Sequence, residues 1–171
     1  AEDVCPHFGI CGGCLYQPIP YEEQLAIKEK QVRSLLDAVC PEYEFEGILG
    51  SPLVQGYRNK MEYTFSNKKW RTWEEVKSGE DFKDSSDALG FHIPGAFDKV
   101  LDIRKCHLQD DLGNRLRLFI KDYGKRNGLT FFDLRAQRGQ LRTLMIRIAS
   151  TGQTMALMSF GEDNPAAIDG F

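Results

Sequence analysis

Three cysteines stand close together near the start of the chain, in the stretch CPHFGICGGCLYQ. They are Cys5, Cys11 and Cys14, and Gly12 and Gly13 separate the last two as a C-x-x-C pair. Such a pair lets one metal ion or cluster take two thiolates, and the glycines allow the backbone to turn tightly between them. A tetrahedral metal site or a cubane iron–sulfur cluster has four ligands, so one more cysteine is required.

The remaining cysteines of the chain are Cys40 and Cys106. Cys40 lies at the end of an apolar helical pattern, which is typical of a small buried hydrophobic residue. Cys106 has the basic neighbours Arg104, Lys105 and His107, which favour a thiolate and offset the charge of a cluster. We therefore expect Cys106 to be the fourth ligand.

The identity of the bound metal stays open on this chemistry alone, because both zinc and iron–sulfur clusters accept soft thiolate ligands. The spacing matches neither of the common ferredoxin cysteine runs, and it lacks the C-x3-C-x2-C run of radical S-adenosylmethionine enzymes. Unligated thiols clustered in a loop would be prone to oxidation, which argues against a site without any metal.

The composition is that of an ordinary globular protein: 171 residues, of which 42% are hydrophobic and 27% charged. We expect a single domain over residues 1–171. No apolar run approaches the ~20 residues that span a bilayer, and no signal peptide pattern is present. We therefore expect a cytoplasmic protein without membrane partners, in a compartment that disfavours structural disulfides.

The small net charge of −3 conceals an uneven distribution. Residues 1–103 carry 11 basic and 18 acidic side chains, whereas residues 104–147 carry 11 basic and 4 acidic ones. A basic region of this kind can bind an anion such as nucleic acid, although charged runs are more often only solubilising.

Two helices are predicted from apolar residues that recur at three- and four-residue steps. The first begins after Pro20 and ends before Pro41, and the second covers residues 108–127 and stops at Gly128. The apolar side of the second is predicted to contain Leu112, Leu116, Phe119, Ile120 and Tyr123.

Alternating apolar and polar residues predict strands that cover much of the rest of the chain. The clearest is 57–65, and two short strands within 88–93 and 99–103 flank the turn PGAFD. The other candidates are 44–50, 130–137, 140–150 and 153–160, and the polar stretch 77–87 is predicted to be a surface loop. The expected fold is α+β: a mainly antiparallel sheet backed by two principal helices, with an N-terminal cysteine-rich loop.

A short segment, YRNKMEYTF, has the residue types that bind RNA. Arg58 and Lys60 would contact phosphates and Asn59 would add a hydrogen bond, while a half-buried strand with a wet polar face explains the pattern equally well. His92, in GFHIPGAF, is a further candidate for RNA contact. His7 and His107 adjoin cysteine ligands and could tune a cluster or serve only as structural hydrogen-bonding groups.

Several of these motifs together strongly resemble the iron–sulfur-containing RNA (uracil-C5)-methyltransferases of the 23S rRNA type. The resemblance is carried by CPHFGICGGCLYQ, YEEQLAIKEKQV, YRNKMEYTF and LGFHIPGAFDKVLDIRKCHLQ, in that order. It implies a [4Fe–4S] cluster held by Cys5, Cys11, Cys14 and Cys106, and it favours the cluster over zinc. It also implies RNA, expected to be rRNA, as the partner, and it raises the weight of RNA contact by Arg58, Asn59 and Lys60. His92 stays a candidate from its residue type alone, since a lone histidine is more often a surface or core group.

The same resemblance implies that methyl transfer from S-adenosyl-L-methionine takes place in a domain that this sequence does not contain. No glycine-rich strand-to-helix turn followed by an acidic residue is present to hold that cofactor. The expectation is a central cluster domain that is monomeric and inactive alone. Two alternatives remain: a nucleic-acid-binding module that holds zinc with four cysteines, and an iron–sulfur electron-transfer domain.

Overall fold

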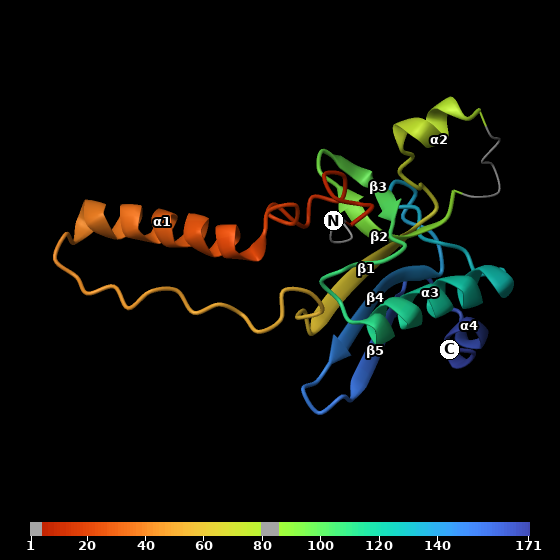
Figure 1. Cartoon of the computed structure of the whole chain (residues 1–171). Coiled ribbons are helices and arrows are strands. Elements are labelled where there is room, and N and C mark those ends of the chain that lie inside the picture. The colour runs from red at the N-terminus through yellow and green to blue at the C-terminus, as the bar shows by residue number, and fades with distance from the viewer. Residues whose placement is uncertain (1–4, 80–85) are drawn as a thin grey trace.

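The computed structural model describes residues 5–79 and 86–171, so part of the segment 77–87 expected as a surface loop lies outside the described residues. The fold is α+β, as predicted, and is built on a five-stranded antiparallel sheet (Figure 1). The strand order is β3-β2-β1-β4-β5. The strands are β1 (Lys60–Ser66), β2 (Ala88–Ile93), β3 (Ala96–Asp102), β4 (Leu141–Ile148) and β5 (Thr154–Phe160). The helices are α1 (Tyr21–Val39), α2 (Trp73–Lys77), α3 (Asp111–Arg126) and α4 (Pro165–Asp169).

The core lies between the sheet and α3. Strand β1 buries Met61, Tyr63 and Phe65 on one face and exposes Lys60 and Glu62 on the other, as its alternation predicts. Buried residues of β4 and α3 complete this layer: Leu144, Ile146 and Ile120. The central strand therefore carries the same apolar face that the YRNKMEYTF motif displays in the sequence.

Helix α3 turns to the sheet a face that matches the predicted one only in part: Ile120 is buried and Leu116 packs against the core, as predicted. Phe119 is 60% exposed, whereas the buried residues are Gly113, Asn114, Arg117, Ile120 and Gly124. The glycines explain the close packing, because a Cβ at Gly124 would lie 2.6 Å from Leu141 Cδ1. A stripe of small and polar residues is invisible to a hydrophobicity pattern, which is why the prediction included Phe119 and missed these residues.

Helix α1 has the predicted bounds but stands away from the sheet (Figure 1). None of its residues is buried, and Leu35 and Val39 are 72% and 80% exposed. Of the two principal helices, only α3 therefore covers the sheet, and Cys40, at the end of α1, is exposed rather than buried. Within the described part of the chain, no helix is both long and apolar enough to cross a membrane.

Two predicted strands are not formed. Residues 44–50 have no regular structure, since no neighbouring strand accepts their backbone hydrogen bonds. Residues 130–137 are not a continuous strand: Phe131 makes only an isolated bridge to Leu141, and residues 134–137 are a turn. At this turn Asp133 Oδ1 accepts hydrogen bonds from the backbone N–H groups of Arg135 (2.9 Å) and Ala136 (3.0 Å). An aspartate that bonds its own backbone in this way competes with strand pairing.

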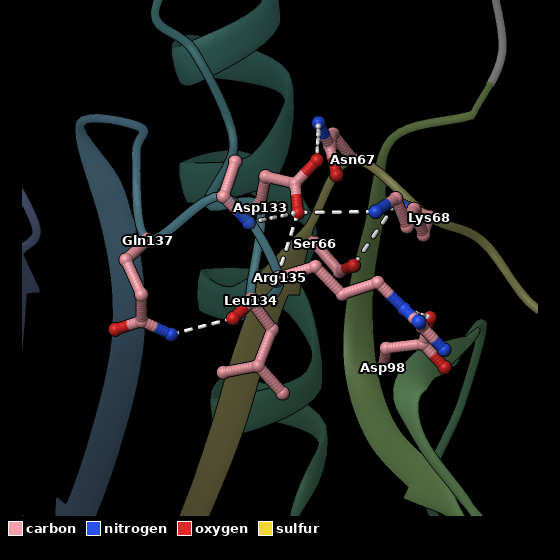
Figure 2. A network of polar contacts seen from close by, with 9 residues as sticks. Ser66, Asn67, Lys68, Asp98, Asp133, Leu134, Arg135 and Gln137 are labelled. Carbon is pink, nitrogen blue, oxygen red and sulfur yellow. Dashed lines mark hydrogen bonds and ion pairs between the residues drawn. The ribbon is translucent and has the colours of Figure 1, made fainter.

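Asp133 also joins this turn to the end of β1 (Figure 2). Its carboxylate accepts hydrogen bonds from Lys68 Nζ at 3.1 Å and Asn67 Nδ2 at 3.2 Å. In the same network, an ion pair between Arg135 and Asp98 links the turn to β3. The hydrogen bond from Ala136, with those from Lys68 and Asn67, holds the pKa of Asp133 well below its usual range.

Candidate cysteine-lined metal site

Backbone hydrogen bonds within the N-terminal cysteine loop set its conformation. The N–H groups of Phe8 and Cys11 donate to the carbonyls of Cys5 and His7 at 3.0 and 3.1 Å. Gly12 adopts φ +70°, and a Cβ there would lie 2.7 Å from Pro94 Cγ in the β2–β3 turn. Position 12 therefore requires glycine for two reasons: its backbone is left-handed, and a side chain there would collide with the hairpin.

His7 connects this loop to the segment that carries Cys106. Its Nε2 accepts a hydrogen bond from the backbone N–H of Arg104 at 2.9 Å, and the side chain is buried. Burial, followed by the positive charges of Arg104 and Arg117, lowers the pKa of His7. The neutral ring can then accept the hydrogen bond, so His7 has a structural role, one of the two roles that the sequence allowed.

Helix α3 holds the Cys106 segment from the other side. Asn114 Oδ1 accepts a hydrogen bond from the N–H of Cys106 at 2.8 Å, and Asn114 Nδ2 donates to the carbonyl of Cys106 at 2.9 Å. The segment just before β1 is also bonded to the Cys106 segment, because the N–H of Arg58 donates a hydrogen bond to the carbonyl of Leu108 at 2.9 Å. Sequence reasoning missed Asn114, since one asparagine in a helix has no pattern that marks it.

These contacts place all four predicted cysteine ligands around one cavity of about 200 Å³. Cys5, Cys11 and Cys14 come from the N-terminal loop and Cys106 from the segment before α3, while Cys40 does not line it. The remaining wall is mostly apolar and includes Met61, Phe91, Ile103 and Leu108, with Arg58, Lys105 and His107 as its basic members.

The electrostatics of the thiols reflect their closeness. The pKa of Cys5 and that of Cys14 are raised, first by burial and then by neighbouring cysteines of the set. Arg58 opposes this effect at Cys14. The N–H of Gly13 points at Cys11 Sγ, 3.5 Å away, as a donor that would stabilise thiolate charge. Four thiolates here would therefore need a cation or a metal cluster among them.

Among residues 5–79 and 86–171, no group of three or more His, Cys, Asp or Glu side chains could hold a single ion. Zinc bonded to sulfur at ~2.3 Å requires sulfurs about 3.8 Å apart. A cubane places irons and sulfides between its thiolates, which therefore stand farther apart. Four cysteine thiolates can in principle serve as the ligands of either group.

The predicted RNA-binding residues lie beside this cavity. Arg58, Asn59 and Lys60 line a second, more open groove of about 580 Å³, together with Tyr57, Met61, Glu62 and Phe91. The groove lies where the sheet opens, because β1 pairs with β2 only over Thr64–Ser66. Arg58 lines both spaces.

His92 lines neither the cavity nor the groove. It is exposed on β2, next to Phe91, which lines both of them. Neighbouring residues of a strand point to opposite faces, so the structure does not bring His92 together with the other three candidates.

The basic region of residues 104–147 is less available to an anion than its charge implies. Arg117, one of the 11 basic side chains of this region, is completely buried and cannot meet an anion at the surface. Lys121 pairs with Asp102 at 2.6 Å and Arg126 with Asp122 at 2.9 Å. Some of these basic side chains are therefore buried or paired with carboxylates of the same chain.

No protein-family model matches the chain. Two similar proteins, each named an uncharacterized RNA methyltransferase, come from Bacteroides thetaiotaomicron and Porphyromonas gingivalis. The first is 49% identical over 162 residues, or 92% of this chain and 35% of the relative. The second is 49% identical over 169 residues, or 95% of this chain and 36% of the relative.

Among solved structures, the fold is similar to Pyrococcus abyssi tRNA (uracil-54, C5)-methyltransferase in complex with S-adenosyl-L-homocysteine. The TM-score is 0.67 at 23% identity, over 94% of this chain and 34% of that one. This likeness establishes the fold alone. In each of these comparisons, the chain spans about a third of the other protein's length.

Proposed function

We propose that this chain is the cluster-binding, RNA-contacting domain of an S-adenosylmethionine-dependent RNA (uracil-C5)-methyltransferase. Cys5, Cys11, Cys14 and Cys106 would hold a [4Fe–4S] cluster. The observation that carries the proposal is the gathering of these four cysteines, from two distant segments, around one cavity. The names of the similar proteins and the fold shared with a uracil-C5 methyltransferase support the reaction class.

In this proposal the sequence resemblance favours a cluster over zinc, since four cysteines around one cavity could serve either group. When bound, the cluster would supply four iron–thiolate bonds that join the N-terminal loop to the Cys106 segment. Joining segments so far apart in the chain strongly constrains the unfolded state. The chain's own residues would orient the ligands, since His7, Gly12 and Asn114 hold the two segments in place.

RNA contact would use the groove beside the cluster cavity. Arg58 and Lys60 are placed to meet phosphates, Asn59 adds a polar group, and the half-exposed ring of Tyr57 offers a face on which an unpaired base can stack. The 23S rRNA as target rests on the sequence resemblance. Methyl transfer, with its nucleophilic cysteine and cofactor pocket, belongs in this proposal to the remaining two thirds of the longer proteins.

Anaerobic purification followed by metal analysis tests the cluster. We expect a brown protein with about four irons and matching sulfide per chain. Cys14→Ser should abolish this colour, whereas Cys40→Ser, which removes an exposed cysteine outside the cavity, should keep it. Stoichiometric zinc in place of iron, in protein never exposed to air, would overturn the cluster assignment.

RNA binding is tested separately, by titrating the loaded protein with a labelled single-stranded 23S rRNA fragment at several salt concentrations. Lys60→Gln should weaken binding and reduce the slope of log K against log salt by about 1. Arg126→Gln, whose pair lies on the exposed face of α3, should leave the slope unchanged. A salt-independent affinity, or none, would remove RNA from the proposed function without affecting the cluster.

A further inference from the structure

Arg117 is an unusual residue, because its guanidinium lies in the core at 0% exposure. It projects from α3 towards the segment that leads to Cys106. Its Nη atoms donate to the backbone carbonyl of Ile103, to that of Arg104 at 2.9 Å, and to Asn114 Oδ1 at 3.3 Å. The guanidinium also lies 5.2 Å from the centre of the Tyr63 ring.

This buried charge has no carboxylate partner among the ion pairs of the described residues. Its Nε has no hydrogen-bond acceptor within that part of the chain. The nearby Asp102 is already bonded to Lys121 Nζ at 2.6 Å and to the N–H of Leu89 at 3.0 Å. A buried cation without a counter-charge is strongly unfavourable, so an anion is expected close to it.

The cysteine cavity lies on the other side of the Cys106 segment. Asn114 connects the two, since its Oδ1 accepts from both the N–H of Cys106 and Arg117 Nη. Ile103, whose carbonyl accepts from Arg117, itself lines the cavity. Four thiolates outweigh the positive core of a [4Fe–4S] cluster and leave the centre with net negative charge.

We propose that Arg117 is the buried counter-charge of the four-cysteine centre, and that it positions the Cys106 segment through the carbonyls of Ile103 and Arg104. This inference rests on the proposed cluster but assigns a role to a residue outside the cavity. A low local dielectric makes such a charge effective over a longer distance than at a surface. Arg117 would therefore stabilise the more negative, reduced form of the cluster and retain the cluster against loss.

Three variants separate the charge from the packing. Arg117→Met removes the charge and keeps an apolar chain of similar length. Arg117→Lys keeps the charge but loses the planar fork that bonds two carbonyls. Arg115→Met is the matched control, since it removes an exposed positive charge from the same helix. All three are purified anaerobically, and iron content, cluster reduction potential and the rate of cluster loss to a chelator are measured.

We expect Arg117→Met to shift the reduction potential to a more negative value and to lose its cluster about tenfold faster than the native protein. Arg117→Lys should keep the native potential, although the loss of the fork lowers its thermal stability. Arg115→Met should match the native protein in each measurement, because solvent screens its charge.

Equal behaviour of Arg117→Lys and Arg117→Met, in potential or in cluster loss, would overturn the inference and leave Arg117 a purely structural residue. If Arg117→Met cannot keep a cluster long enough for a potential, a Lys variant with native retention still supports the inference. Absence of iron from the native protein is a different outcome, which defeats the proposed function itself.

Discussion

The two long helices form a natural comparison, because the sequence predicts both from the same kind of pattern. Helix α3 packs on the sheet and buries five residues, including an asparagine and an arginine. Helix α1 is longer and buries none. An apolar pattern thus predicts that a helix forms, but it does not predict that a partner surface within the same domain covers it.

The two helices also differ in the interactions that stabilise them. The position of α3 is set by core packing and by the polar contacts that hold the Cys106 segment. Helix α1 depends on its own backbone and a few exposed side-chain pairs, such as Arg33 with Glu29 at 2.8 Å. A helix with no buried residue gains little stability from tertiary packing, so α1 should open far more easily than α3.

The largest expected effect is a direct test of this contrast. Ile120→Ala, in the buried face of α3, should lower the free energy of unfolding by about 2–5 kcal/mol, because it leaves a cavity in the core. Leu35→Ala, in α1 and 72% exposed, should change it by less than about 0.5 kcal/mol. Urea titrations of the anaerobic protein measure both. Equal losses of unfolding free energy in the two variants would mean that another surface covers α1 in solution.

The next effect concerns the polar part of the α3 face. Asn114→Ala removes both hydrogen bonds to the backbone of Cys106 at a buried position, and should cost about 1–3 kcal/mol. It should also speed the loss of iron. Asn127→Ala, at the exposed end of the same helix, is the control and should have neither effect. Unchanged iron retention in Asn114→Ala would show that α3 does not support the ligand loop.

The pH dependence of stability tests the turn at the far end of β1. The folded pKa of Asp133 is depressed, so its contribution is present above the unfolded pKa, about 4, and is lost as the pH falls through the folded value. The native protein should therefore exceed Asp133→Asn in stability at neutral pH, and this gap should narrow below about pH 4. A gap that stays constant as the pH falls well below that value would contradict the sign.

The smallest effect belongs to α1. Glu29→Gln breaks the exposed pair with Arg33 and should leave the urea midpoint of the domain unchanged within measurement error, because solvent screens such pairs. A loss as large as that of Asn114→Ala would show that α1 takes part in the cooperative unit, and the comparison between the helices would fail.

Much of the fold follows from local patterns in the sequence. The bounds of α1 and the alternating faces of β1 are predictable because helix and strand periods are set by backbone geometry. The strand predicted over residues 130–137 forms only as isolated bridges at Phe131 and Asp133, because Asp133 bonds the N–H groups that follow it and the chain turns there.

The candidate site divides in the same way. The sequence by itself determined which thiols are available, their C-x-x-C spacing and the basic neighbours that favoured Cys106 over Cys40, since these are properties of residue type and order. Only the tertiary structure decided that the four cysteines line one cavity, that His92 lies apart from Arg58, and that Arg117 is buried. Each of these depends on contacts between segments far apart in the chain, and no local spacing encodes which face of a helix or strand meets which partner.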